Sequence, residues 1–315
     1  MLALRYHSIG DLTGLGLEDI PVPEPAAGEV LVRMRAASLN PVDWKIATGS
    51  FRLIVRGGVP RTMGSDFAGE VTAIGSGVTT FTPGDRVFGF IDPFRHTGGT
   101  FAGFAAVPVE FTHHLPAEIG YTDGAALACV GATAVTLCNL GHVGTGSKVL
   151  VNGASGGVGH VAVQVAHARG AQVTATASAA RHEFVRSLGA HSCIDYRTEP
   201  MKRWPGDFDA VLDCVPNIPR SVQRRLLTRR GHYVTTVPNA ATFVLDPLIN
   251  RCGGRQRHGV MLKPDAGVIE EVLGYVAQGR LRCAIEREFP LQLARDAIER
   301  SRSGRVQGKI VLRIS

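Results

Sequence analysis

The stretch that decides the fold is VLVNGASGGVGHVAVQVAHARGAQVTATAS, residues 149–178. The apolar run 149–151 predicts a buried strand, and residues 172–177 predict a second one. Between them lie a glycine cluster and then small and apolar residues at helical spacing. The stretch therefore predicts a strand, tight turn, helix and strand, which is one unit of a parallel sheet.

The glycine cluster, residues 154–159, has the form A-x-G-G-x-G, with Ala154 where G-x-G-x-x-G has its first glycine. A turn of this kind aims backbone N–H groups at a pyrophosphate from the N-terminus of a helix. Gly156 lets the backbone approach the phosphates, and Gly159 lets helix and strand pack closely. The candidate phosphate-binding residues are Ser155, Gly156, Gly157, Val158 and Gly159. The alternative is a glycine turn that holds no ligand.

The second strand ends without an acidic residue. NAD-specific folds place Asp or Glu about 20 residues past the loop, where it binds the ribose 2′-hydroxyl. Here the segment TATASAARH, residues 174–182, offers Ser178 with Arg181 close behind. A neutral donor beside a cation suits a 2′-phosphate, which favours NADP(H) over NAD(H). The alternative is that Arg181 merely starts the next helix.

The 315 residues are enough for two domains. Residues 1–116 are rich in short β runs punctuated by Gly and Pro, which predicts a small barrel-like β domain. From residue 117 helix and strand patterns alternate, including a helix over 219–231 and a strand over 232–237. The strands of 264–315 are expected to return to the first domain. The predicted domains are therefore 1–116 with 264–315, and 117–263.

Composition excludes little but narrows the class. The net charge of +7 comes with 34 Lys and Arg residues, most of them Arg. A basic chain can bind nucleic acid, but no binding motif accompanies the charge, so we do not expect a nucleic-acid partner. A solvated arginine-rich surface, or a surface that attracts an anionic cofactor, explains the charge instead. The six scattered cysteines form no C-x-x-C pair, so we expect free thiols. We see no signal peptide and no apolar stretch near the ~20 residues of a membrane span, and expect a cytoplasmic protein.

Eight blocks in order carry a family resemblance: AASLNPVDWK, GSDFAGEV, PGDRVFGF, GTFAGFAAV, GATAVTL, VNGASGGVG, FDAVLDCV and SGRVQGKIVL. The chain resembles the zinc-free quinone oxidoreductase branch of the medium-chain dehydrogenase/reductase superfamily. The resemblance implies an α/β fold: a GroES-like β-rich catalytic domain with an inserted Rossmann domain, a doubly wound parallel sheet. It also implies a cleft between the domains and a homodimer. Such dimers often pair Rossmann edge strands, and residues 232–237 or 241–246 are the candidates.

The resemblance also indicates whether the chain has the ligands of a catalytic zinc site. Zinc-dependent relatives hold their metal with a Cys, a His and another Cys, and the matching positions here are Asn40, Ser65 and Cys129. Only the cysteine is present, and one thiolate cannot replace an open site of three ligands. The resemblance therefore implies no catalytic zinc.

Further cofactor residues follow from the resemblance alone. Thr133 is expected to contact the nicotinamide ribose or ring, and Tyr196 to lie by the 2′-phosphate. Cys214 ends a strand that faces the adenosine or ribose, and Val237 and Asn239 lie near the nicotinamide amide. For Tyr196 the alternative is a half-buried tyrosine that only packs.

The expected chemistry is hydride transfer from the cofactor to a quinone ring or to the β-carbon of an enone. The anion that remains needs hydrogen-bond donors and then a proton, which solvent could deliver. Asn40 and Lys45 are the candidate catalytic residues, although Lys45 could equally be a surface ammonium. Asp43 could orient Lys45 or cap the helix that begins there. Aromatic residues that could line the substrate pocket, or simply belong to the core, are Trp44, Phe51, Phe90 and Phe94.

The sequence thus favours an NADPH-dependent, zinc-independent reductase of quinones or α,β-unsaturated carbonyls. A second reading keeps fold and cofactor but assigns one step of a bacterial biosynthetic pathway, as an enoyl or enone reductase. A third is a non-catalytic NADPH-sensing protein that binds RNA or a protein partner, for which the basic charge is the only support.

Overall fold

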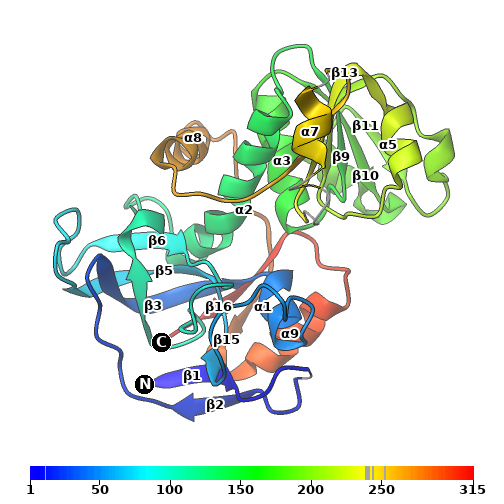
Figure 1. Ribbon diagram of the computed structural model, residues 1–315. Helices are drawn as coiled ribbons and strands as arrows, with labels where there is room; N and C mark the ends of the chain where they lie inside the picture. Colours follow the sequence, from blue (N-terminus) through cyan, green and yellow to red (C-terminus); the bar gives the residue numbers. More distant parts are fainter. Residues whose placement is uncertain (11, 238–241, 243–244, 252) are drawn as a thin grey trace. The chain divides into compact units, whose positions relative to one another are not determined.

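The computed structural model describes residues 1–10, 12–237, 242, 245–251 and 253–315. They form two compact units (Figure 1). Unit 1 comprises Met1–Cys129 and Ile285–Ser315, and unit 2 comprises Val130–Ala284. The domain boundaries predicted at 116/117 and 263/264 lie earlier in the chain than these divisions. The compact units are defined by the contacts within them, and this division does not test where the family's domains begin and end. The predicted boundaries at 116/117 and 263/264 therefore stay predictions.

Unit 1 is built from β-strands. One sheet has the order β2-β1-β4, and a larger one has the order β15-β16-β3-β5-β6-β8 with β7 paired to β3. The strands are β1 (Leu2–Tyr6), β2 (Gly16–Asp19), β3 (Glu29–Leu39), β4 (Arg61–Thr62), β5 (Asp66–Ile74), β6 (Arg86–Phe90), β7 (Phe104–Pro108), β8 (Thr112–His114), β15 (Ile285–Pro290) and β16 (Lys309–Arg313). The helical segments are α1 (Pro41–Ala47), η1 (Val109–Phe111), η4 (Leu291–Leu293) and α9 (Ala294–Arg302).

The C-terminal strands return to the first part of the chain, as expected. β16 pairs antiparallel with β3, with Ile310 opposite Leu39 and Leu312 opposite Ala37. Alternating residues of β3, among them Val30, Val32 and Met34, are buried in one core with Ile310 and Leu312. The last residues of the chain thereby complete the sheet that the first residues begin.

Unit 2 contains a parallel sheet of order β11-β10-β9-β12-β13-β14. Its strands are β9 (Lys148–Asn152), β10 (Gln172–Ala177), β11 (Ser192–Asp195), β12 (Phe208–Asp213), β13 (Leu227–Thr235) and β14 (Gln256–Gly259). Its helices are α3 (Gly157–Ala168), η2 (Ala179–Arg181), α4 (His182–Ser187), η3 (Met201–Arg203), α5 (Arg220–Leu226), α7 (Asp246–Arg251) and α8 (Ala266–Ala277). Because the order runs outward both ways from β9, α3 and α5 cover opposite faces (Figure 1). The predicted doubly wound sheet is confirmed.

The helix α2 (Tyr121–Leu140) belongs to both units. Its 20 residues are long and apolar enough to cross a membrane, so the expectation that no stretch reaches this length was wrong. Most of its most apolar window, 72%, is buried inside the structure, as in the core helix of a globular fold. No other helix among the described residues meets the same criteria.

Two predictions about residues 219–237 were also wrong. The helix expected over 219–231 ends at Leu226, because Leu227 already pairs with Phe208 of β12. A side chain at Gly231 would approach the Phe208 carbonyl within 2.8 Å, so the backbone passes close there. Residues 232–237 are not an edge strand, because β13 is paired with both β12 and β14.

Candidate active site

The turn between β9 and α3 has the geometry that the glycine motif predicts. Gly153 adopts a positive φ of 75° and donates its N–H to Thr176 Oγ1 at 3.0 Å. A Cβ at Gly159 would overlap the Gly153 carbonyl, so this glycine is needed for helix and strand to pack. A Cβ at Gly156 would meet only that carbonyl oxygen, at an ordinary 3.4 Å. Packing does not require a glycine at 156, and the predicted approach of a ligand to the backbone there stays a prediction.

A buried polar network lies at the carboxyl ends of β9, β10 and β12 and supports this turn. Thr176 donates to Asn152 Oδ1 at 2.7 Å, and Asn152 Nδ2 donates to Asp213 Oδ1 at 2.7 Å. Tyr233 donates its hydroxyl to Asp213 Oδ2. Burial raises the pKa of Asp213. Sequence reasoning missed these residues, although a polar residue that ends a buried strand was a visible signal.

The ends of β10 and β11 bring together the residues predicted for the 2′-phosphate. Ala177 pairs with Asp195, so the next residues, Ser178 and Tyr196, follow neighbouring strand ends. Ser178 precedes η2, whose last residue is Arg181, and Tyr196 is 51% exposed. The guanidinium of Arg197 lies 5.9 Å from the Tyr196 ring centroid. Arg197 is a second cation here that sequence reasoning missed, although it stands in the same block, IDYR.

The other residues that were predicted to contact the cofactor lie in different surroundings. Cys214 donates its backbone N–H to the Asn152 carbonyl at 3.1 Å, so it adjoins the glycine turn, and burial raises the pKa of its thiol. Thr133 is buried in the part of α2 that belongs to unit 2, and Val237 is exposed after β13. Asn239 lies outside the described residues.

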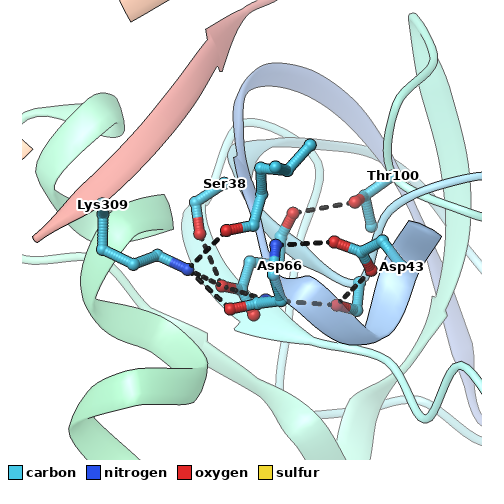
Figure 2. Close-up of polar contacts among 8 residues, drawn as sticks. Ser38, Asp43, Asp66, Thr100 and Lys309 are labelled. Atoms are coloured by element: carbon cyan, nitrogen blue, oxygen red, sulfur yellow. Dashed lines mark hydrogen bonds and ion pairs between the residues drawn. The ribbon is translucent and has the colours of Figure 1, made fainter. Parts of the chain in front are cut away.

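In unit 1 a second buried polar network contains Ser38, Asp43, Asp66 and Lys309 (Figure 2). Asn40, the residue that precedes α1, joins its members. Asn40 Nδ2 donates to Asp66 Oδ2 at 2.8 Å and to Ser65 Oγ at 3.3 Å. Asn40 Oδ1 accepts from Lys309 Nζ at 2.6 Å. Both amide hydrogens are therefore donated inside the protein, which leaves none for an oxyanion in this conformation.

Three donors converge on one oxygen of Asp66. Ser38 Oγ, Asn40 Nδ2 and Lys309 Nζ lie 2.5, 2.8 and 3.4 Å from Asp66 Oδ2. Asp66 and Lys309 are 0% and 2% exposed. Burial raises the pKa of Asp66, and the ammonium of Lys309 opposes that rise. Since donors alone meet Oδ2, the arrangement fits an ionised carboxylate paired with the ammonium.

Asp43 is the second carboxylate of the network. Its Oδ2 accepts the Asn40 N–H at 2.7 Å and its Oδ1 accepts the Ser65 hydroxyl at 2.9 Å. Asp43 therefore caps α1, as one of its two predicted roles required. Burial, with a smaller contribution from Asp66, raises its pKa to about 7. Two carboxylates and one ammonium carry a net charge of −1, which a single proton on Asp43 removes.

This assignment predicts a pH-dependent stability. Folded Asp43 keeps its proton up to pH about 7, whereas an unfolded aspartate loses it near 3.8. The free energy of unfolding therefore gains its full contribution below pH 4 and loses it as the pH rises to about 7, by roughly 2–4 kcal/mol. The variant D43N lacks this loss. Urea unfolding of both proteins in a W204F background, where Trp44 reports unit 1, measures the difference, and a difference independent of pH would contradict the assignment.

The residues at the three positions that hold zinc in relatives do not fit a metal. The Lys309 ammonium lies 2.6 Å from Asn40 Oδ1, so a cation already occupies that oxygen. The Ser65 hydroxyl is donated to Asp43. The part of the chain that the structure describes contains no group of three or more His, Cys, Asp or Glu residues placed to hold a metal ion.

Some of the other predicted catalytic and pocket residues pack in the core of unit 1, and the rest are partly accessible. Phe90 is buried against Phe111, and Trp44 donates to Ser301 Oγ at 3.2 Å and packs on the core of unit 1. Lys45 is half-buried, with its ammonium 5.6 Å from the Trp44 ring centroid. Phe51 and Phe94 form an edge-to-face pair, described below.

Comparison with known proteins agrees with this architecture. Residues 26–117 match the family model "Alcohol dehydrogenase GroES-like domain", and residues 188–312 match "Zinc-binding dehydrogenase". The chain is 38% identical to the chloroplast envelope quinone oxidoreductase homolog of Arabidopsis thaliana over 99% of this chain and 98% of that protein. It is 30% identical to the NADPH-dependent alkenal/one oxidoreductase of the same plant, over 99% and 79%. The solved quinone oxidoreductase of Coxiella burnetii superposes with a TM-score of 0.90, at 30% identity over 100% and 99%.

A GroES-like unit with a six-stranded Rossmann sheet defines a medium-chain dehydrogenase/reductase. The chain belongs to that superfamily, in its quinone oxidoreductase branch, and is a reductase of the quinone and alkenal/one oxidoreductase type. A nicotinamide cofactor is implied by the same relatives.

Proposed function

We propose that the chain is an NADPH-dependent reductase that needs no zinc and acts on quinones or α,β-unsaturated carbonyls. The observation that carries the choice of NADPH is the end of β10, where Ser178 and Arg181 stand in place of an acid and Tyr196 and Arg197 follow the next strand. A doubly charged 2′-phosphate suits two guanidinium groups and a hydroxyl.

In unit 2, different residues would bind different parts of the cofactor. The turn at 153–159 and the N-terminus of α3 would bind the pyrophosphate through backbone N–H groups. Arg181 and Arg197 would bind the 2′-phosphate. Bound there, the cofactor supplies the hydride for the reaction.

In unit 1 the anion that remains after hydride transfer must find donors other than the Asn40 amide. Lys45 stays a candidate, because its ammonium is half-buried beside Trp44. Asn40 itself is better described as a residue that connects Lys309, Asp66 and Ser65.

The cofactor preference gives a direct prediction. The double variant R181A/R197A should raise the Kd for NADPH by roughly 10–100-fold and leave that for NADH nearly unchanged, because it removes charge-assisted bonds to a group that NADH lacks. Titration of nucleotide fluorescence measures both constants. The variant R203A, at an exposed arginine of η3, is the control and should change neither. An equal loss for both nucleotides would contradict the proposed 2′-phosphate site.

The reaction is tested by following NADPH and NADH oxidation with a panel of acceptors, with and without a chelator. The panel contains 1,4-benzoquinone, 9,10-phenanthrenequinone, a 2-alkenal, a cyclic enone and a simple ketone. We expect chelator-insensitive oxidation of NADPH by quinone or enone, and none by the ketone, which is poorly polarised without a metal. Binding of NADPH without turnover of any acceptor would instead favour a dedicated biosynthetic substrate or a non-catalytic role.

We further propose that the protein works as a cytoplasmic homodimer. Among the described strands of unit 2, β14 lies at the edge on the β13 side, so any pairing of edge strands there would use residues 256–259 instead of 232–237. The other candidate stretch, 241–246, lies partly outside the described residues. Light scattering coupled to size-exclusion chromatography measures the mass in solution, and a monomer at micromolar concentration would contradict the dimer.

A further inference from the structure

Two loops of unit 1, residues 51–60 and 92–98, are held together as one structure. Arg56 donates its backbone N–H to the Phe94 carbonyl at 2.7 Å, and Thr62 donates to the Thr97 carbonyl at 3.1 Å. The rings of Phe51 and Phe94, one from each loop, meet edge to face with centroids 5.3 Å apart and an angle of 85°. The position of one ring is therefore set by the other loop.

The buried side chain of Arg61 joins the same two loops through hydrogen bonds. Its Nη1 donates to the Arg56 carbonyl at 2.7 Å, and its Nη2 donates to the carbonyls of Pro93 and His96 at 2.8 and 2.5 Å. Arg61 is only 3% exposed. The three acceptors are backbone carbonyls from both loops, so this guanidinium determines the spacing between them. Loss of any one bond would leave a buried polar group without a partner.

The loops expose apolar side chains, which needs a reason. Leu53 is 100% exposed and Ile54 is 60% exposed, and Phe51 and Phe94 remain partly accessible beside them. Large exposed apolar groups that cluster on one loop mark a surface that binds something. Phe90 and Trp44 are committed to the core, so Phe51 and Phe94 are the members of the predicted aromatic set that are left to meet a ligand.

We propose that Phe51 and Phe94 contact the flat ring of a quinone or aryl enone, and that Arg61 is a positioning residue that holds the two rings in place for it. A rigid edge-to-face pair offers apolar area without further loss of side-chain entropy, and a conjugated ring gains more from it than a short aliphatic chain does. The pair thereby selects flat acceptors over short alkenals. This inference rests on the proposed reductase function.

Arg86 provides a matched control for Arg61. Its Nη1 donates to the carbonyls of Pro116 and Ala117 at 3.3 and 2.8 Å, and its Nη2 to that of Ile119 at 2.7 Å. It therefore makes the same three-carbonyl pattern in the same unit, on a different segment. The variants R61Q and R86Q remove the same kind of contact and differ in which loops they release.

The experiment measures KM and kcat with NADPH for 9,10-phenanthrenequinone and for a 2-alkenal in wild type, R61Q, R86Q, F94L and F94Y. We expect R61Q and F94L to raise KM for the quinone about 10-fold with little change for the alkenal. F94Y keeps the aromatic ring and should raise it less than F94L does, and R86Q should behave as wild type. Quenching of tryptophan fluorescence by the quinone, without nucleotide, should show the same order of Kd. F94L keeps the test decisive if R61Q does not fold.

Three outcomes would overturn the inference. R86Q could change quinone KM as much as R61Q, F94L could affect both acceptors equally, or wild type could reduce the alkenal and not the quinone. In each case the reductase function stands. Oxidation of NADPH by no acceptor at all would instead contradict the proposed function.

Discussion

The variant G156A is expected to fold as wild type does and to lose NADPH binding by about 1,000-fold. Gly156 has an ordinary φ of −83°, and an added methyl group would meet only the Gly153 carbonyl oxygen, at 3.4 Å. The same methyl group would stand at the N-terminus of α3, where we propose that backbone N–H groups bind the pyrophosphate. Loss of two charge-assisted bonds at 1.5–3 kcal/mol each corresponds to roughly this factor.

Fluorescence titration with NADPH and a thermal melt followed by circular dichroism measure the two halves of this prediction. The variant G159A is the comparison, because its methyl group would overlap the Gly153 carbonyl and lie 2.8 Å from the Ala154 Cα atom. It should lower the melting temperature as well as binding, whereas G156A should lower binding only. If G156A binds NADPH as wild type does, the pyrophosphate does not lie at this turn.

The variant K309M is expected to destabilise unit 1 by about 3–5 kcal/mol. It would leave the fully buried Asp66 carboxylate without a cation and remove the donor that Asn40 Oδ1 and the Leu39 carbonyl share. Breaking one side of a buried ion pair costs this much because the other charge stays buried. Urea unfolding in the W204F background, where Trp44 reports unit 1, measures the loss.

The double variant K309M/D66N separates the charge from the packing. It removes the unpaired carboxylate but keeps a side chain that can accept from Ser38 and Asn40, so more than half of the stability should return. A loss below 1 kcal/mol in K309M alone would mean that Asp66 is not held as an ion in the folded protein. A double variant no better than K309M would point to lost packing of the lysine stem.

Much of the secondary structure of unit 2 could be predicted from the sequence. The strands at β9 and β10 and the helix between them follow from local periodicity and from the glycines at 153–159. The absence of an acid after β10 is a local property too, and Ser178 and Arg181 follow the strand as expected. The helix predicted over 219–231 failed for the opposite reason, because pairing of Leu227 with Phe208 of β12 overrides local preference.

The buried polar networks around Asn40 and Asn152 could not be predicted in this way, because their members lie far apart in the sequence. Lys309 bonds Asn40 across 269 positions of sequence, and Asn152 bonds Asp213 across 61. No repeating pattern in the sequence indicates either contact. Both contacts exist only because β16 lies beside β3 and β12 lies beside β9. The order of residues was enough for the class of fold and the glycine turn, and the proposed preference for NADPH rests on it too. The hydrogen bonds of the Asn40 amide, the raised pKa of Asp43 and the joining of two loops by Arg61 were decided by tertiary structure, because burial and the packing of strands determine the partner of each buried polar group.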